Sequence, residues 1–173
     1  MSQAIAEKLQ EKFTENVTGI SSREVAVRTP SFTQWTVDVN RDNIVNVLTF
    51  ARDDLGLTFL ADITAVDYLQ MPDVERFTMI YILRNLADDS EIIIKAAVPE
   101  EPAEIGSACD VYRGANWLER EVYDMFGITF LGHPDLKRIL TPDEFEGHPL
   151  RKDFPVQGRG FRDRFPVISR DAS

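Results

Sequence analysis

Two segments in the first third of the chain repeat apolar side chains at the period of an α-helix. Residues 2–18 are predicted to form a first helix, capped by Ser2 and ended by Gly19. A second helix is predicted to begin at Asn40 and to end at Gly56. The positions expected to face the core are Ile5, Leu9, Phe13 and Val17 in the first helix, and Ile44, Val47, Leu48, Ala51 and Leu55 in the second.

Five other segments are rich in β-branched and aromatic residues, which favour strands. They are residues 24–29, 35–39, 57–68, 76–85 and 91–98. The polar residues 87–90 separate the last two segments and predict a turn, and therefore an antiparallel hairpin. Together these elements predict an α+β fold in two layers, with the helices packed on one face of a mixed five-stranded sheet.

The pattern changes after residue 98. Residues 99–115 predict a short helix with loops. Asn116 and Glu119 then have the spacing of a capping box, which predicts the start of a further helix. Gly127 lies where this helix is expected to end, because glycine adopts the left-handed conformation that commonly closes a helix.

The last 47 residues, 127–173, have a different composition. They contain 5 of the 9 glycines and 5 of the 9 prolines, which exclude a long helix or a central strand. They also contain many large apolar residues, which are unusual in a solvated linker and indicate packing against another surface. We therefore predict a globular α+β domain, residues 1–126, followed by a long, extended C-terminal tail, punctuated by proline and glycine, that packs on partner chains.

Composition excludes several classes of function. The 173-residue chain has the size of one domain, and residues 1–110 carry its net charge of −10. Nucleic acid is an unsuitable partner for such an acidic body, because phosphate binding needs clustered lysine and arginine. The single cysteine, Cys109, excludes an internal disulfide, a four-thiolate iron–sulfur cluster and a cysteine-rich zinc site within this chain.

Neither a membrane span nor an export signal is indicated. No apolar run approaches the ~20 residues that a spanning helix needs. Residues 1–13 mix charges with apolar side chains, unlike a signal peptide. The expected location is therefore cytoplasmic.

The helical segment 117–126 contains a conflict between its apolar face and its charges. On a helical wheel one broad apolar arc is formed by Trp117, Leu118, Val122, Met125 and Phe126. Of the charged residues, Glu121 falls inside the arc, Asp124 lies at its edge, and Glu119 and Arg120 lie off it. A carboxylate on an apolar face needs a partner or water. We therefore expect Glu121 either to lie at the wet rim of the core or to form an ion pair with Arg138 or Arg151.

Two Gly-His-Pro tripeptides contain the only histidines, His133 and His148. The prolines, Pro134 and Pro149, fix their own φ and extend the histidine before them, so each tripeptide forms a stiff corner. A basic pair follows each corner: Lys137 with Arg138, and Arg151 with Lys152. Such pairs can bind carboxylates or the carbonyls at the C-terminus of a helix. The repeat therefore indicates anchoring of the tail rather than catalysis.

Catalysis by these residues is disfavoured by their spacing. The acidic residues of the helical segment could supply an acid–base pair or metal ligands. However, Glu119 and Glu121 point about 160° apart on one helix and cannot face one substrate. His133, His148 and Cys109 could hold zinc, but they form no H-x-x-x-H or C-x-x-C cluster. We predict no catalytic, cofactor-binding or metal-binding residue in this chain.

Residues 115–140 and 147–155 closely resemble a known family, the C subunit of bacterial type I NADH:quinone oxidoreductase, which corresponds to the 30-kDa subunit of mitochondrial complex I. The residues expected to be structural or to lie at interfaces are Trp117, Glu119, Arg120, Glu121, Asp124, His133, Pro134, Lys137, Arg138, His148, Pro149, Arg151, Lys152 and Asp153. The segments "ITAVDY" and "RFTMIYIL" also look like the family. Lys137 is a mild departure, since the family often has arginine there.

The resemblance implies a structural subunit in the peripheral arm of a proton-translocating complex. Electrons would pass from NADH through FMN and Fe–S clusters to quinone, and all of these groups would belong to partner subunits. The implied partners are the D, B and I subunits, on the cytoplasmic side of the bacterial inner membrane. The implied role of this chain is assembly of the quinone-reducing module in a hetero-oligomer.

Three rival interpretations remain open. The chain could be the equivalent subunit of a related membrane-bound hydrogenase or of a ferredoxin- or F420-linked dehydrogenase. It could be a freestanding metal-dependent hydrolase that uses His133 and His148. It could also be an adaptor or regulatory module outside respiration.

Overall fold

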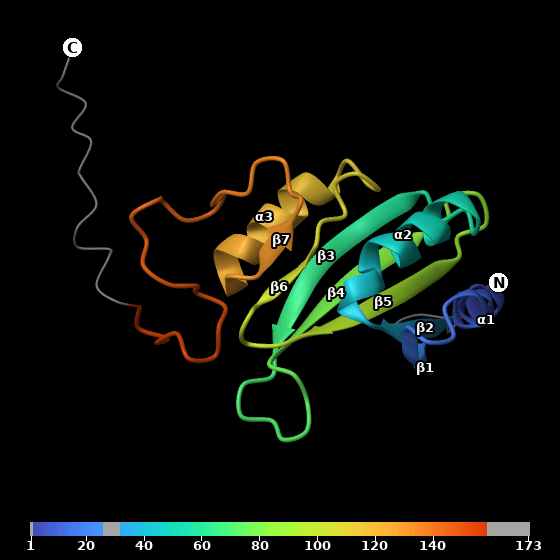
Figure 1. Ribbon diagram of the computed structural model, residues 1–173, viewed down its shortest axis with the longest axis horizontal. Coiled ribbons are helices and arrows are strands. Elements are labelled where there is room, and N and C mark those ends of the chain that lie inside the picture. The colour runs from blue at the N-terminus through green and yellow to red at the C-terminus, as the bar shows by residue number, and fades with distance from the viewer. Residues whose placement is uncertain (1, 26–31, 159–173) are drawn as a thin grey trace, which may run out of the picture.

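The computed structural model of the protein describes residues 2–25 and 32–158 (Figure 1). In chain order the elements are α1 (Ser2–Lys12), β1 (Val17–Val25), β2 (Phe32–Val39), η1 (Arg41–Asn43), α2 (Ile44–Asp53), β3 (Phe59–Asp67), β4 (Phe77–Arg84), β5 (Glu91–Val98), β6 (Glu104–Gly106), α3 (Ala115–Phe126) and β7 (Thr129–Leu131). The 3-10 turn η1 leads directly into α2. Within the described ranges, no helix is both long enough and apolar enough to cross a membrane.

Strands β1 to β5 form one sheet in the order β1-β2-β5-β4-β3. β2 and β5 run parallel, with Val37 opposite Ile94, and the other neighbouring strands run antiparallel. The sheet is therefore mixed and five-stranded, and the hairpin predicted between residues 76 and 98 is confirmed. The short strands β6 and β7 form a separate parallel pair.

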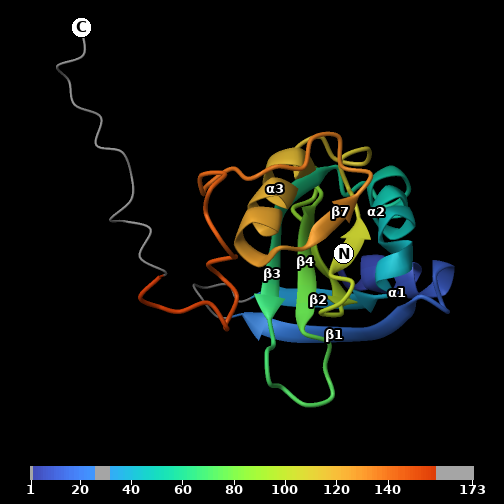
Figure 2. The ribbon, with the colours of Figure 1, turned by 60° about the vertical axis from the view of Figure 1, so that its left-hand side comes forward.

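The core lies on one face of the sheet. In β4, Phe77, Met79, Tyr81 and Leu83 are fully buried, whereas the residues between them are only partly covered. These buried side chains form one cluster with residues of all three α-helices. Figure 2 shows α2 and α3 on the same side of β3 and β4. The predicted two-layer α+β architecture is confirmed.

The first helix is shorter than predicted. α1 ends at Lys12, and both Val17 and Gly19 belong to β1. The N–H groups of Asn16 and Val17 bond to the carbonyl of Phe13 and turn the chain into the strand. Val17 still packs against the core from β1, which explains why the helical pattern extended too far. Of the strand predicted at residues 24–29, positions 26–29 lie outside the described residues.

The second helical segment begins as predicted. The Asn40 side chain accepts a hydrogen bond from the Asp42 N–H at 3.0 Å and caps η1. The predicted core positions within α2 are buried, and Leu55 lies beyond the helix and is half-buried. Gly56 has a φ of +71° and turns the chain toward β3.

Two predictions about residues 99–127 are wrong. Residues 99–114 form β6 and turns rather than a short helix. Gly114, not Asn116, occupies the N-cap of α3, and no side chain caps the helix there. The capping box fails because the Glu119 carboxylate points toward the loop of residues 107–109 instead. The predicted end is confirmed, since Gly127 is the left-handed C-cap with a φ of +73°.

Candidate interaction site at helix α3 and the strap

The segment after β7 crosses α3 of its own chain and ends near the strand ends of β3 and β4 (Figure 1). We call residues 132–158 the strap. Every residue expected to be structural or to lie at an interface is in α3 or in the strap. The strap binds α3 through hydrogen bonds and ion pairs rather than through a continuous apolar face.

The helix buries different charges from those predicted. Glu121 is exposed and forms no ion pair with a described residue. Of the two alternatives for Glu121, pairing with Arg138 or Arg151 is therefore wrong, and its exposure agrees with the wet position. Trp117, which is 60% exposed, is also outside the core. Glu119 and Asp124 are instead fully buried. The reason is that other segments cover α3 and supply the donors: the loop of residues 107–109 binds Glu119, and the strap binds Asp124.

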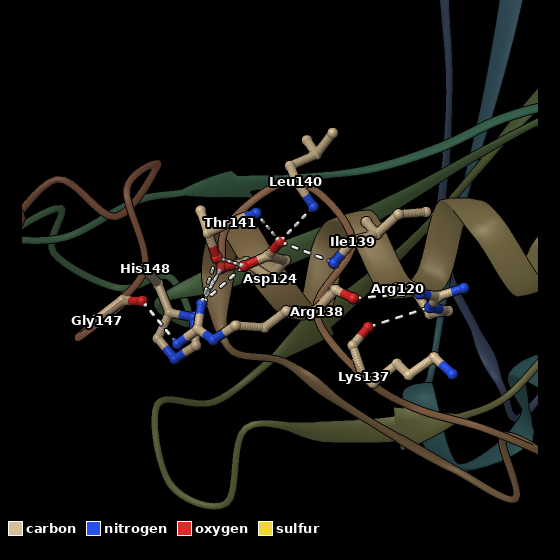
Figure 3. A network of polar contacts seen from close by, with 9 residues as sticks. All are labelled: Arg120, Asp124, Lys137, Arg138, Ile139, Leu140, Thr141, Gly147 and His148. Atoms are coloured by element: carbon tan, nitrogen blue, oxygen red, sulfur yellow. Dashed lines mark hydrogen bonds and ion pairs between the residues drawn. The ribbon is translucent and has the colours of Figure 1, made fainter. Parts of the chain in front are cut away.

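Asp124 is the centre of a polar network that joins α3 to the strap (Figure 3). One carboxylate oxygen accepts the backbone N–H groups of Ile139, Leu140 and Thr141 at 3.0, 2.8 and 2.8 Å. The other accepts Arg138 Nη1 at 2.7 Å and the Thr141 hydroxyl. We call this contact the clamp. Burial alone would raise the pKa of Asp124, but the bonds from Thr141, Leu140 and Arg138 hold it well below its usual range.

Arg120 holds the strap one turn earlier on α3. Its Nε and Nη2 groups donate to the carbonyls of Lys137 and Arg138, both at 3.1 Å (Figure 3). Its guanidinium also lies 5.2 Å from the ring centroid of Trp117. The side chain of Lys137 points elsewhere and pairs with Asp135 at 2.7 Å. Of this basic pair, Lys137 is therefore held to α3 through its carbonyl, whereas Arg138 is held both through its carbonyl and through its guanidinium.

The second tripeptide caps the C-terminus of α3. The carbonyls of the last residues of a helix have no partner within it. Here His148 Nδ1 donates to the Asp124 carbonyl at 2.9 Å, and the Leu150 N–H donates to the Met125 carbonyl at 3.1 Å. Arg151 Nε donates to the carbonyl of Phe126. This geometry agrees with the expectation that a Gly-His-Pro corner and a basic residue can bind the carbonyls at the C-terminus of a helix.

The pH dependence of stability provides a test of the His148 contact. Burial lowers the pKa of His148 below its usual value, and the nearby Arg151 and Arg138 lower it further, whereas its bond to the Asp124 carbonyl opposes this. The folded chain therefore keeps His148 neutral, while the unfolded chain binds a proton below about pH 6.5. The stability due to this difference is present above that pH and decreases as the pH falls below it.

We expect the free energy of unfolding, measured by urea titration, to fall between pH 7.5 and 5.5, and to fall less in His148→Asn. Asparagine keeps an N–H donor near the Nδ1 position but does not titrate. His133→Asn controls for the loss of an imidazole as such. Equal pH slopes for the wild-type chain and His148→Asn would contradict a role for His148 protonation.

The first tripeptide lies at the other end of α3. His133 Nε2 donates to the Asn116 carbonyl at 3.2 Å, while its Nδ1 accepts the Asp135 N–H at 3.0 Å. The carbonyls bound by His133 and His148 are eight residues apart, which is about 12 Å along a helix. One metal ion cannot be held by both histidines in this arrangement. The geometry therefore disfavours the hydrolase interpretation.

A different group of possible ligands surrounds Glu119. Its carboxylate accepts the Ser107 hydroxyl at 2.7 Å, the Ala108 N–H at 2.6 Å and the Cys109 thiol at 3.5 Å. Ligand atoms of Cys109, Glu119 and His133 lie within 4.8 Å of one another. Burial raises the pKa of the Cys109 thiol to about 11, so it stays protonated at neutral pH. Metal binding here would have to break the hydrogen bonds that already use all three side chains.

The end of the strap reaches the sheet at a second ionic contact. Arg76, buried at the start of β4, pairs with Asp67 at 3.3 Å, with Asp153 at 3.0 Å and with Glu100. The Lys152 N–H donates to Asp67 at 2.9 Å. We call this contact the latch. Burial raises the pKa of Asp67, but the bonds from Lys152 and Arg76 outweigh it and lower the pKa overall.

Sequence reasoning did not single out Asp67, Arg76 or Ser107 as part of the site. Asp67 lies near the end of the family-like segment "ITAVDY", which was the only signal for it. Nothing in the order of residues indicates that β3 would meet residues 152–153. Pro134 and Pro149 both lie in turns of the strap.

The match to a known protein family covers the same residues. The sequence profile of the family described as "Respiratory-chain NADH dehydrogenase, 30 Kd subunit" matches residues 37–160, which include all of α3 and the strap. The chain belongs to this family. The resemblance noted from the motifs is confirmed, and the chain is accordingly a subunit of an NADH–quinone oxidoreductase.

Individual members agree with this assignment. The C subunit of the NADH-quinone oxidoreductase of Trichlorobacter lovleyi is 46% identical over 89% of this chain and 90% of that protein. A solved structure of the trypsin-resistant fragment (1–134) of Nqo5 superposes with a TM-score of 0.65 and 33% identity, over 79% of this chain and all of the fragment. A chain of an archaeal membrane-bound sulfane sulfur reductase, with 23% identity and a TM-score of 0.69 over 97% of this chain and 93% of that chain, shares the fold.

Proposed function

We propose that this 30-kDa-family chain is a structural subunit of the peripheral arm that binds no cofactor of its own and serves assembly of the quinone-reducing module. Its partners are the D, B and I subunits, on the cytoplasmic side of the inner membrane. FMN, the Fe–S clusters and quinone are bound by partner subunits. The hydrogen-bonded arrangement of Cys109, Glu119 and His133 supports this assignment, because their ligand atoms are already engaged within the chain.

The observation that carries the proposal is the orientation of the strap. Three of its basic or polar side chains, Arg138, His148 and Arg151, bind α3. In contrast, three of its large apolar side chains, Leu140, Leu150 and Val156, are exposed. Among the described residues, five of the nine exposed large apolar side chains lie between residues 117 and 156. Leu140 is 62% exposed although its own N–H is fixed on Asp124. Large apolar residues that are exposed although hydrogen bonds hold their backbone are typical of a protein interface.

We define the docking surface as Trp117, Leu131, Leu140 and Leu150, each of which is more than half exposed. The cation–π contact with Arg120 fixes Trp117 beside the strap. Exposed tryptophan is a residue type enriched at interface hot spots. Burial of this surface in the assembled complex would cover the apolar side chains that the chain itself leaves in water.

A triple variant with Leu131→Ser, Leu140→Ser and Leu150→Ser tests this proposal. We expect the isolated variant to keep its melting temperature, since these side chains do not contribute to the core. We expect its co-purification with the detergent-solubilised membrane complex to fall at least tenfold, as the loss of apolar contact area predicts. NADH oxidation by the membranes should fall in parallel because fewer complexes assemble.

Leu86→Ser is the matched control. Leu86 is 66% exposed but lies in the turn between β4 and β5, away from the docking surface. It should incorporate normally. Incorporation of the triple variant at the wild-type level would refute the docking surface. The identity of the co-purifying subunits also tests the proposed partners, since a complex recovered without the D, B and I subunits would contradict them.

A further inference from the structure

The clamp and the latch differ in whether a buried charged group loses its partners when the strap detaches. At the clamp, all the donors that satisfy the Asp124 carboxylate come from residues 138–141. Asp124 is fully buried, so losing these donors would leave a charge without a partner. Breaking a buried pair in this way is strongly unfavourable. The clamp is therefore part of the permanent fold.

At the latch, the domain side stays satisfied without the strap. If Asp153 leaves, Arg76 keeps Asp67 and Glu100 as partners. If the Lys152 N–H leaves, Asp67 keeps Arg76 and the Leu69 N–H, which lies at 2.8 Å. Asp153 itself is 51% exposed, so water can solvate its carboxylate when it leaves the buried Arg76. Opening the latch thus leaves no buried charge unpaired.

The contacts between the latch and the clamp are also replaceable by water. The carbonyls of Met125 and Phe126 lie at the end of α3, where helices are commonly solvated. Gly147, with a φ of +97°, precedes His148 and provides a point at which the chain can turn. We call residues 148–158 the distal strap. Its release also separates Phe154 from the ring of Phe145, on which it stacks with 5.7 Å between centroids. The backbone donors of residues 139–141 to Asp124 do not depend on the distal strap.

The closed distal strap also places two like charges together. The guanidinium groups of Arg76 and Arg151 lie 5.0 and 5.3 Å from the centroid of the same ring, that of Phe77. Arg151 has no carboxylate within ion-pair distance among the residues that the structure describes. An acidic surface outside this chain would offer Arg151, together with the neighbouring Lys152, a more favourable environment than the closed position does.

We propose that the distal strap is a releasable segment, closed on Arg76 in the free chain and opened to bind an acidic surface of a partner subunit. The clamp stays closed in both states, so the docking surface around Leu140 is preformed while the distal strap adapts. This inference rests on the proposed function for its partner, but the closed state and its weak latch concern the free chain alone. An experiment can therefore contradict the releasable distal strap without contradicting the proposed function, and the reverse.

Amide hydrogen exchange of the isolated full chain tests the latch. We expect the amides of Ile139, Leu140 and Thr141 to be protected at least tenfold more than those of Leu150 and Lys152, because the latch opens by local rather than global unfolding. Asp153→Asn should lower protection of the latter pair by about two- to fivefold, the effect of one exposed ion pair. Raising NaCl to about 0.5 M should have a similar effect through screening.

Asp143→Asn is the control, since Asp143 is exposed in the same strap and forms no ion pair with a described residue. It should leave both sets of amides unchanged. The proposal would be overturned if the amides of residues 139–141 and those of residues 150 and 152 were equally protected. It would also be overturned if Asp153→Asn lowered the protection of both groups of amides equally, because the strap would then move as one unit. Absence of protection at residues 150 and 152 in the wild-type chain would exclude the closed state.

Lys152→Gln tests the acidic partner. The Lys152 side chain takes no part in the latch, which uses only its backbone N–H. We expect unchanged hydrogen exchange in the free variant, but at least a threefold loss of co-purification with the membrane complex at about 0.3 M NaCl. Lys8→Gln, an exposed substitution on α1, should behave as wild type. Equal recovery of both variants at every salt concentration would exclude the acidic surface as the partner.

Discussion

Asp124→Asn is expected to lower the free energy of unfolding by about 3–5 kcal/mol, the cost of breaking a buried ion pair from one side. The aspartate accepts three backbone N–H groups, a hydroxyl and the Arg138 guanidinium. Asparagine would keep one acceptor oxygen, but its NH₂ group would face donors, and Arg138 would lose its counter-charge. Urea unfolding monitored by circular dichroism measures the effect.

The same variant should change the response to acid. The pKa of Asp124 is lower in the folded chain than its unfolded value near 3.9, so its contribution to stability is present above about pH 4 and is lost as the pH falls further. Asp124→Asn should therefore remove part of the acid sensitivity of the wild-type chain. Asp143→Asn should stay within about 0.5 kcal/mol of wild type. If both variants had the same unfolding midpoint, the clamp would be unimportant for stability.

Gly127→Ala is expected to destabilise the chain by about 2–4 kcal/mol, through two effects that a control can separate. The left-handed backbone at a φ of +73° costs alanine about 1–2 kcal/mol. A Cβ atom would also lie 2.6 Å from Arg151 Nη2 and even closer to His148 Nε2. Both side chains would have to leave the end of α3, which would remove the caps of its last carbonyls.

Gly158→Ala provides the matched substitution. Gly158 has the same φ of +73°, but nothing lies within 4 Å of the position that its Cβ would occupy. It should show only the cost of the backbone conformation. The difference between the two variants in urea unfolding therefore measures the contact of the strap with α3. A difference of zero would mean that His148 and Arg151 do not press against Gly127.

The sheet could be predicted from sequence because its strands have strong local patterns. β4 and β5 alternate buried and less buried residues without interruption, and their buried face was visible as β-branched and aromatic runs. The end of the third helix at Gly127 was equally local, since one glycine closes it. The Asn40 cap was local as well.

The failures concern residues whose partners are distant in sequence. A helical wheel assumes one buried face, but α3 is covered by both the sheet and the strap, so the wheel assigned Glu121 to the apolar arc and placed Glu119 outside it. Glu119 is buried because the loop at Ser107 supplies its donors. Asp67 meets the Lys152 N–H across 85 positions in the chain. Such contacts depend on the path of the backbone in the folded chain. The periodicity of apolar residues in the sequence does not reveal this path.

The caps on α3 have a consequence for biosynthesis. The carbonyls that end this helix are satisfied by residues 148–151, which leave the ribosome more than twenty positions after the helix itself. During synthesis, the last carbonyls of the helix and the Asp124 carboxylate must therefore stay hydrated or be bound by a chaperone. Translation that stops within this interval would therefore yield a polypeptide with a formed sheet and an unfinished third helix, and quality control could recognise such a product before any complex is built.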